Sequence, residues 1–187
     1  GVTVGNTSNG ALVYLDKQTG QFHYGVGYMT DKIDANSNGK WYGNGTAELD
    51  VSTLNAFAEY TTPILPNIHI TTGIAMYKTS VQGFTEESSQ YNITVEDFTL
   101  NDAELYVDIT GMHTSVYGNT YLTLGTSMHQ SLSNTSIVWD GGLVSEFSND
   151  DVAFRTTVMH TYKMFYAKAT TSSVDGETFE IGFNLQF

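Results

Sequence analysis

The chain has 187 residues, with 20 acidic and 7 basic side chains, and its net charge is −13. This acid excess argues against nucleic acid as a partner, because the phosphate backbone requires a basic surface. There is no cysteine, which excludes disulfide bonds and thiolate metal sites. The length fits a single domain over residues 1–187, and no apolar run approaches the roughly 20 residues that a membrane-spanning helix needs.

Apolar and polar residues alternate along most of the chain, which predicts an all-β protein. Asn9-Gly10 is a strong hairpin signal and separates the first two predicted strands. Between Ser52 and Leu54 the alternation changes phase, which predicts a β-bulge. In chain order the predicted strands cover residues 2–8, 11–17, 21–33, 46–61, 68–80, 101–115, 120–132, 136–148, 152–171 and 178–187.

The connections between these strands alternate in length. Short ones are expected at 17–20, 62–67, 116–119 and 149–151, and longer polar ones at 34–45 and 81–101, with shorter ones at 133–136 and 172–177. Short turns at one end and longer loops at the other are typical of a membrane barrel.

Two architectures explain this alternation. A soluble β-sandwich turns its apolar faces inward, whereas a membrane barrel turns them outward. The polar faces carry Arg155, the only arginine, and a set of glycines that suits a narrow interior (Gly25, Gly27, Gly73, Gly125 and Gly182). The apolar faces end in aromatic residues, as interfacial girdles do (Tyr24, Tyr28, Tyr60, Trp139, Tyr162 and Phe187). An antiparallel up-and-down transmembrane β-barrel is therefore expected.

The last nine residues, FEIGFNLQF, place Phe179, Ile181, Phe183, Leu185 and Phe187 on one face. This segment resembles the C-terminal signal strand of Gram-negative outer-membrane β-barrel proteins, in which such residues are read by the barrel-insertion machinery. The resemblance implies an outer-membrane location with periplasmic termini, extracellular long loops, and outer-membrane lipid and lipopolysaccharide as surroundings. It also implies an even strand number, for which ten strands are favoured and eight strands with a separate N-terminal segment are the alternative.

Charged residues on the polar faces are expected to line the lumen. The predicted lumen network contains Arg155, Lys163, Glu104, Asp108, Asp140, Glu146 and Glu180. In a dry lumen these groups must pair, because unpaired buried charge is costly. In a wet lumen an acidic lining favours cations.

The favoured function is a small barrel without enzyme activity or a cofactor, with a mostly plugged lumen and a structural or surface-interaction role. Loop aromatics are the candidate recognition residues for an extracellular ligand or protein partner (Trp41, Tyr42, Phe84 and Tyr91). The alternatives are a narrow, porin-like, cation-preferring channel, a lipid-modifying enzyme and a soluble β-sandwich.

Two weaker motifs suggest chemistry. His113 with Ser115 and His129 with Ser131 share strand faces, so a histidine could activate a serine in a lipid hydrolase, although polar filling of the lumen is the favoured interpretation. Asp34, Asn36 and Asn38 precede a glycine like the start of a calcium loop, but the twelfth position is Gly45 and lacks the expected glutamate. An ordinary polar loop is favoured there.

Overall fold

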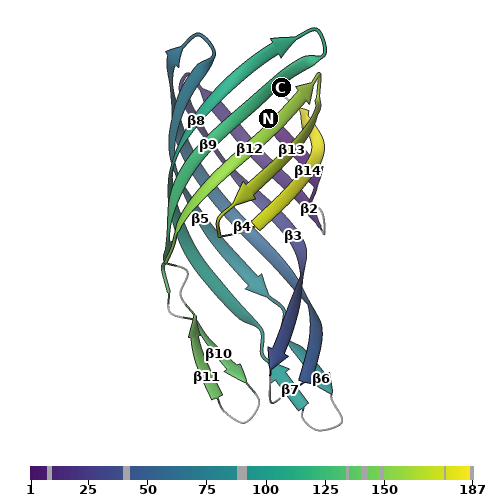
Figure 1. Cartoon of the computed structure of the whole chain (residues 1–187). Coiled ribbons are helices and arrows are strands. Elements are labelled where there is room, and N and C mark those ends of the chain that lie inside the picture. Colours follow the sequence, from purple (N-terminus) through teal and green to yellow (C-terminus); the bar gives the residue numbers. More distant parts are fainter. Residues whose placement is uncertain are drawn as a thin grey trace.

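The computed structural model describes residues 1–7, 10–39, 43–87, 92–133, 135–139, 143–147, 150–174 and 176–185. Ten strands form a closed barrel (Figure 1). They are β1 (Val2–Asn6), β2 (Ala11–Thr19), β3 (Phe22–Gly39), β4 (Gly43–Leu65), β5 (Ile68–Val81), β8 (Phe98–Ser115), β9 (Gly118–Ser131), β12 (Val152–Tyr162), β13 (Phe165–Ser172) and β14 (Gly176–Leu185). Among the described residues, no helix is long and apolar enough to cross a bilayer.

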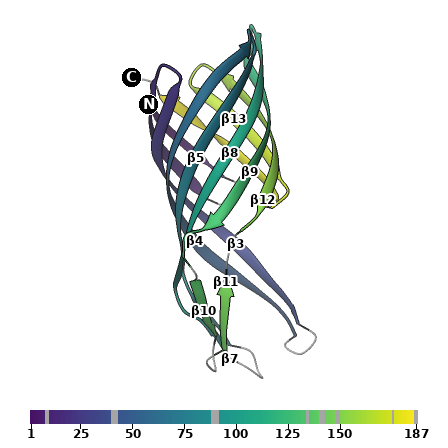
Figure 2. The same ribbon diagram turned by 90° about the vertical axis from the view of Figure 1, so that its left-hand side faces the viewer.

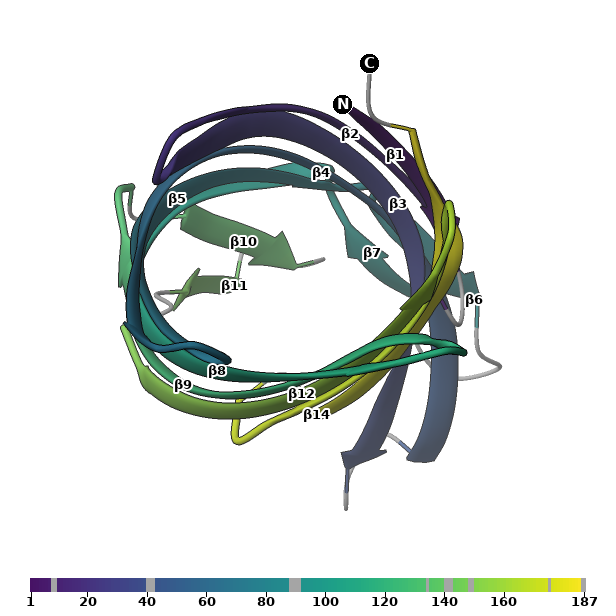
Figure 3. The ribbon, with the colours of Figure 1, turned by 90° about the horizontal axis from the view of Figure 1, so that it is seen from above.

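Barrel closure depends on β1, which pairs with β2 on one side and with β14 on the other. All neighbouring strands are antiparallel, in the order β1-β14-β13-β12-β9-β8-β5-β4-β3-β2. Seen along its axis, the ribbon is a closed ring (Figure 3). The prediction of a ten-stranded antiparallel barrel is confirmed. The eight-stranded alternative and the β-sandwich are wrong, because β1 belongs to the wall and a single sheet closes on itself.

The strand count is correct although two predicted strands are wrong. The predicted strand 152–171 is two strands, β12 and β13, joined by a tight turn in which Lys163 has a positive φ of 56°. The predicted strand 136–148 is not in the wall. It forms most of the hairpin β10 (Thr135–Trp139) and β11 (Leu143–Phe147). Alternation alone does not distinguish a wall strand from a hairpin strand, and these two errors cancel.

The two ends of the barrel differ. Turns at residues 20–21, 66–67, 116–117 and 163–164 lie at one end. Val2 and Leu185, which pair with each other, lie toward the same end, since Val2 also pairs with Leu15 near the β2–β3 turn. At the other end β3 and β4 continue together beyond the barrel (Figure 2). The segment 34–45, predicted as a loop, is thus mostly paired strand, and 149–151 belongs to the long β9–β12 connection.

A second sheet lies beyond this long-loop end. β6 (Phe84–Glu87) and β7 (Asn92–Val95) from the β5–β8 connection join β10 and β11 from the β9–β12 connection, in the order β11-β10-β7-β6. Trp139 pairs with Val95 at their junction. Figure 1 shows the four strands below the barrel, and Figure 3 shows β10 and β11 within its outline. Two connections that are far apart in the sequence thus form one four-stranded sheet.

The wall has opposite polarity on its two faces. Large apolar side chains point outward and are exposed, including Val4, Val13, Val26, Leu54, Ile74, Leu105, Val107, Leu122, Val158 and Ile181. The inward positions between them hold mostly glycine, threonine, tyrosine and charged residues. This arrangement is the reverse of that in a soluble protein.

The predicted bulge near Ser52–Leu54 is absent, because the pairing of β4 with both neighbours is continuous there. The apolar residues change face instead. Val51 and Val81, which pair across β4 and β5, are buried near the long-loop mouth, whereas Leu54 points outward. The register shift in this strand pair lies at Pro63–Leu65, where proline cannot donate a ladder hydrogen bond.

Candidate functional site: a charged network in the lumen

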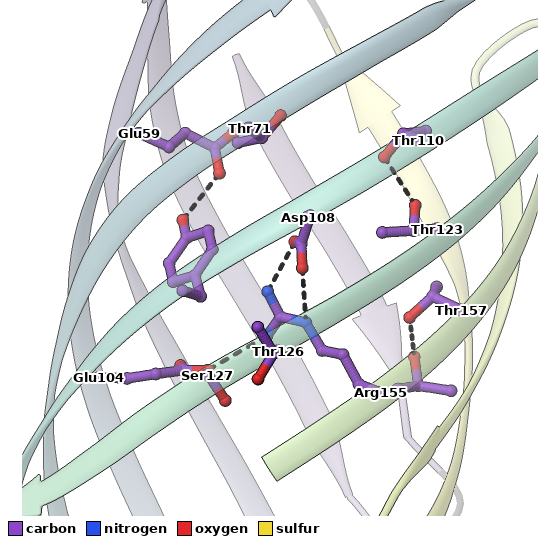
Figure 4. A network of polar contacts seen from close by, with 12 residues as sticks. Glu59, Thr71, Glu104, Asp108, Thr110, Thr123, Thr126, Ser127, Arg155 and Thr157 are labelled. Carbon is purple, nitrogen blue, oxygen red and sulfur yellow. Dashed lines mark hydrogen bonds and ion pairs between the residues drawn. The ribbon is translucent and has the colours of Figure 1, made fainter. Parts of the chain in front are cut away.

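Arg155 of β12 is the centre of a charged cluster on the inner face (Figure 4). Its Nε and Nη2 donate to the two carboxylate oxygens of Asp108 at 3.1 and 2.6 Å, and its Nη1 donates to Glu104 Oε1 at 3.2 Å. The side chains of Arg155, Asp108 and Glu104 are 24%, 13% and 5% exposed. A bidentate pair that is shielded from water is stronger and more specific in geometry than a surface ion pair.

A glycine on the intervening strand makes this contact possible. Gly125 of β9 pairs with Asp108 on one side and with Arg155 on the other. A Cβ atom at Gly125 would overlap Asp108 Oδ1. Arg155 therefore reaches across β9 to β8 because no side chain stands between them.

The cluster continues along the wall through Tyr106. The Tyr106 ring lies 4.9 Å from the Arg155 guanidinium carbon, and its hydroxyl donates to Glu59 Oε2 at 2.8 Å. Glu59 Oε1 is 2.7 Å from His23 Nδ1, and His23 Nε2 is 2.8 Å from Asp16 Oδ2. One polar chain thus connects β2, β3, β4, β8 and β12.

A second branch extends from Glu104 toward the long-loop end. Tyr77 donates its hydroxyl to Glu104 Oε2 at 2.6 Å, and His129 Nε2 lies 3.6 Å from Glu104 Oε1. Glu104 is almost fully buried, and its two oxygens face Arg155, Tyr77 and His129. These partners offset the cost of burying the carboxylate.

Paired threonine hydroxyls lie beside the charged cluster. They join Thr53 to Thr79, Thr61 to Thr71, Thr110 to Thr123 and Thr157 to Thr170 at 2.9–3.1 Å. Figure 4 shows the Thr110–Thr123 pair next to Arg155. Cross-strand pairs of this kind each contribute roughly 0.2–1 kcal/mol. They also keep this part of the lumen polar without adding charge.

The bore contains a chamber of ≈ 350 Å³. At about 30 Å³ per molecule it has room for roughly a dozen waters. It is lined by Thr3, Tyr14, Asp16, His23, Asn55, Phe57, Glu59, Ala75, Tyr77, Glu104, Tyr106, Asp108, Arg155, Lys168 and Asn184. Carboxylates outnumber basic side chains in this lining.

The structure brings together three residues of the predicted network, Arg155, Glu104 and Asp108. Glu180 also faces inward but pairs with Lys168, Nζ to Oε1, at 2.8 Å. Asp140 lies outside the described residues.

Two members of the predicted network do not belong to the lumen. Lys163 is in the exposed β12–β13 turn, where its Nζ lies 5.3 Å from the centroid of the Tyr162 ring. Glu146 is on β11, in the second sheet rather than the barrel wall. The first error arose because the alternation was counted through the turn. Inward positions are odd-numbered in β12 and even-numbered in β13, so Lys168 takes the place that was predicted for Lys163.

Sequence reasoning missed His23, Asp16, Glu59, Tyr77 and Tyr106. Each lies at an inward position of a predicted strand, so the period-two pattern contained the signal. Their contacts depend on which strands are neighbours and in which register, which the pattern does not specify.

The predicted histidine–serine pairs are not formed. His129 Nε2 lies 3.1 Å from Ser127 Oγ, while Ser131 Oγ donates to Asp102 at 3.2 Å. Because His129 uses the same nitrogen for Ser127 and Glu104, these groups do not form a serine–histidine–acid relay, which needs both ring nitrogens. Ser115 donates to the Gly118 carbonyl oxygen in the β8–β9 turn.

The calcium-loop interpretation conflicts with the fold. Asp34, Asn36 and Asn38 lie in β3, paired with β4, and an extended strand separates alternate residues by about 6.8 Å. They are not arranged in the compact loop that calcium binding requires. Within the described part of the chain, no three His, Asp or Glu residues form a group that could hold a metal ion.

The loop aromatics and the terminal signal remain predictions. Trp41, Tyr42 and Tyr91 lie outside the described residues, and Phe84 begins β6. In β14 the side chains of Phe179, Ile181, Phe183 and Leu185 are exposed on the outer face, and Phe187 lies outside the described residues.

Replacing Gly73 by alanine is expected to lower the free energy of unfolding by about 1–3 kcal/mol through overpacking. A Cβ at Gly73 would overlap the Tyr106 ring, which cannot move without losing its contacts with Glu59 and Arg155. Gly111→Ala is the matched control, because a Cβ added there would have no atom within 4 Å apart from those of Gly111 and its two chain neighbours. Equilibrium unfolding in lipid vesicles measures both, and equal effects would contradict the interlocked inner face.

No protein family and no curated protein matches the chain. Among solved structures, the beta domain of the Bordetella autotransporter Brka matches with a TM-score of 0.51 and 11% sequence identity, over 100% of this chain and 96% of that chain. At this identity the similarity concerns the fold alone. The chain therefore shares the closed β-barrel fold of that domain.

Proposed function

We propose that this protein is a bacterial outer-membrane β-barrel with a polar, mostly plugged lumen and a structural or surface-interaction role. In this proposal the termini and short turns face the periplasm, and the long loops are extracellular. The observation that carries it is the polarity of the wall, with apolar side chains outside and a charged network inside. Among β-sheets, only a closed barrel satisfies all its backbone hydrogen bonds while exposing such a surface to lipid.

The apolar outer surface has a suitable height and border. On β5 the outward positions are largely apolar from Ile68 to Met76, and the next is Lys78. At ~3.4 Å per residue and a tilt near 45° this corresponds to roughly 20 Å, close to the ~25 Å band of outer-membrane barrels. Aromatic pairs flank two of the short turns, Phe22 with Tyr60 and Phe165 with Phe183, each with ring centroids 4.8 Å apart.

The long-loop end supports an interaction role. The second sheet joins two connections into one structure there. A cavity of ≈ 740 Å³ lies at the long-loop end of the barrel, between residues of β3, β4, β5 and the start of β8. Its lining residues include Asp31, Lys32, Asp50, Asp97 and Phe98. We infer that an extracellular ligand or protein partner binds at this end, and that outer-membrane lipid, lipopolysaccharide and the barrel-insertion machinery contact the outer wall. No enzyme activity or cofactor is proposed.

A narrow cation-preferring channel is the second candidate. It is favoured by the chamber of ≈ 350 Å³, whose lining contains four carboxylates, Asp16, Glu59, Glu104 and Asp108. An acidic lining raises the local concentration of cations. Arg155 and the inward tyrosines (Tyr14, Tyr77 and Tyr106) occupy space in the lumen, so the lumen is expected to be too narrow for larger solutes.

Electrical recording in a planar lipid bilayer with a salt gradient separates the two candidates. The plugged barrel is expected to insert, seen as heat-modifiable migration on gels, and to give no discrete current steps. Discrete steps with a cation-biased reversal potential would instead establish the channel. Recovery in the aqueous phase without detergent, with no insertion, would contradict both.

A further inference from the structure

His23 is held between two carboxylates on the inner face. Its Nδ1 lies 2.7 Å from Glu59 Oε1 of β4, and its Nε2 lies 2.8 Å from Asp16 Oδ2 of β2. The ring packs edge-on against Phe57 at a centroid distance of 5.1 Å. Gly25, two residues further along β3, leaves space beside Asp16, since a Cβ there would overlap the Leu15 carbonyl oxygen and contact Phe57. The ring is therefore fixed with both nitrogens engaged.

This geometry defines how many protons the three groups share. An ionised carboxylate only accepts hydrogen bonds, and a neutral imidazole carries only one N–H. Contacts at both nitrogens therefore need two protons for Asp16, His23 and Glu59 together. Both are expected on the ring, because a carboxylic acid is a stronger acid than an imidazolium ion. In that form their summed charge is −1.

His160 provides a contrast within the same protein. Its Nδ1 lies 3.0 Å from Thr120 Oγ1, and its Nε2 lies 3.1 Å from the Tyr117 carbonyl oxygen. The threonine hydroxyl can donate, so one ring proton on Nε2 satisfies both contacts. The two histidines thus differ in their proton requirement because of their partners.

In the described part of the chain, the surrounding groups place no second cation on these carboxylates, because the α-amino group of Gly1 donates to the backbone carbonyl oxygen of Asp16, at 2.7 Å. Glu59 accepts the Tyr106 hydroxyl at its second oxygen, and Arg155 lies over that ring, 4.9 Å from its centroid. Lys168 is paired with Glu180. Among the described residues no lysine or arginine forms an ion pair with Asp16 or Glu59. The bridging protons are the main compensation for these two carboxylates.

We propose that Asp16, His23 and Glu59 form a proton-dependent clamp that joins β2, β3 and β4 and sets the charge of the lumen chamber. As the pH rises, the clamp releases one proton to the water of the chamber. One hydrogen bond is then lost, the summed charge changes from −1 to −2, and a carboxylate that lines the chamber loses its partner. This inference follows from the barrel interior and does not depend on whether the lumen conducts.

Nitrogen-15 NMR of the histidine rings, in the full chain refolded in detergent micelles, tests the proton count. At a pH where free histidine is neutral, His23 is expected to show two protonated nitrogens and His160 one protonated and one bare nitrogen. His23→Gln assigns the signal. In Asp16→Asn only one carboxylate remains, so His23 is expected to show one bare nitrogen. A bare His23 nitrogen in the wild-type chain under the same conditions would overturn the proposal.

The pH dependence of unfolding tests the clamp independently. The folding equilibrium constant of the wild type is divided by that of His23→Gln at each pH. This ratio is expected to fall by about tenfold as the pH rises through the range in which the clamp loses its proton. The ratio falls with rising pH because the form that stabilises the barrel is the one with two protons. The corresponding ratio for His160→Gln should stay flat. A flat ratio for His23→Gln as well would overturn the proposal.

Discussion

Replacing Arg155 by alanine is expected to lower the free energy of unfolding by about 3–5 kcal/mol. The change would leave Asp108 and Glu104, which are 13% and 5% exposed at the side chain, without their cation. It would also remove the guanidinium from the Tyr106 ring. Urea-induced unfolding of the protein inserted in lipid vesicles measures the effect.

Two comparisons separate the loss of charge compensation from the loss of packing. The combined variant Arg155→Met, Asp108→Asn, Glu104→Gln removes the charges together and is expected to recover much of the stability. Lys168→Ala removes another inward cation, the partner of Glu180. Its side chain is 34% exposed, so an effect below about 1 kcal/mol is expected. If Arg155→Ala stays within about 0.5 kcal/mol of the wild type, the network does not stabilise the barrel.

An arginine in place of Val107 is expected to destabilise the inserted protein by about 2–4 kcal/mol. Val107 lies in the middle of the outward apolar positions of β8, and its side chain points away from the barrel with 45% of its surface exposed. In a bilayer that surface faces hydrocarbon, where a guanidinium loses its hydration. The free energy of unfolding from vesicles measures the cost.

The same substitution at the border of the apolar surface is the control. Thr19 of β2 is outward and exposed beside the short β2–β3 turn, one outward position beyond the charged Lys17, so Thr19→Arg is expected to cost only about 0–1 kcal/mol. A difference in cost between the two positions is the signature of a membrane. Equal, small effects at both positions would mean that the outer wall faces water, and the outer-membrane proposal would fail.

Several features of the site were predictable because they depend on local sequence. Alternation assigned Arg155, Glu104 and Asp108 to the polar face of their strands, and a lone arginine among acids predicted an internal ion pair. The glycines on the same face were expected to serve close packing. In the structure Gly125 lets Arg155 reach Asp108, and Gly73 accommodates the Tyr106 ring.

The failures have a common physical cause. The alternation of apolar and polar residues shows on which face of a strand a residue lies, but it gives neither the partner strand nor the register. The Lys163 turn was missed, and the inward assignments in the rest of the predicted strand 152–171 shifted by one residue, which hid Lys168. The hairpin of β10 and β11 alternates like a wall strand, so only its pairing with β7 reveals its place in the second sheet.

The sequence by itself determined the β class and the polarity of most strand faces, because these depend on residue type and spacing, whereas the even number of strands was implied by the resemblance of the last nine residues to the signal strand of outer-membrane barrels. Only the tertiary structure decided that β1 closes the barrel against β14 and that His23 lies between Asp16 and Glu59. These features require strands far apart in the chain to lie side by side in one register. The register is set by the packing of the whole wall and by no single segment.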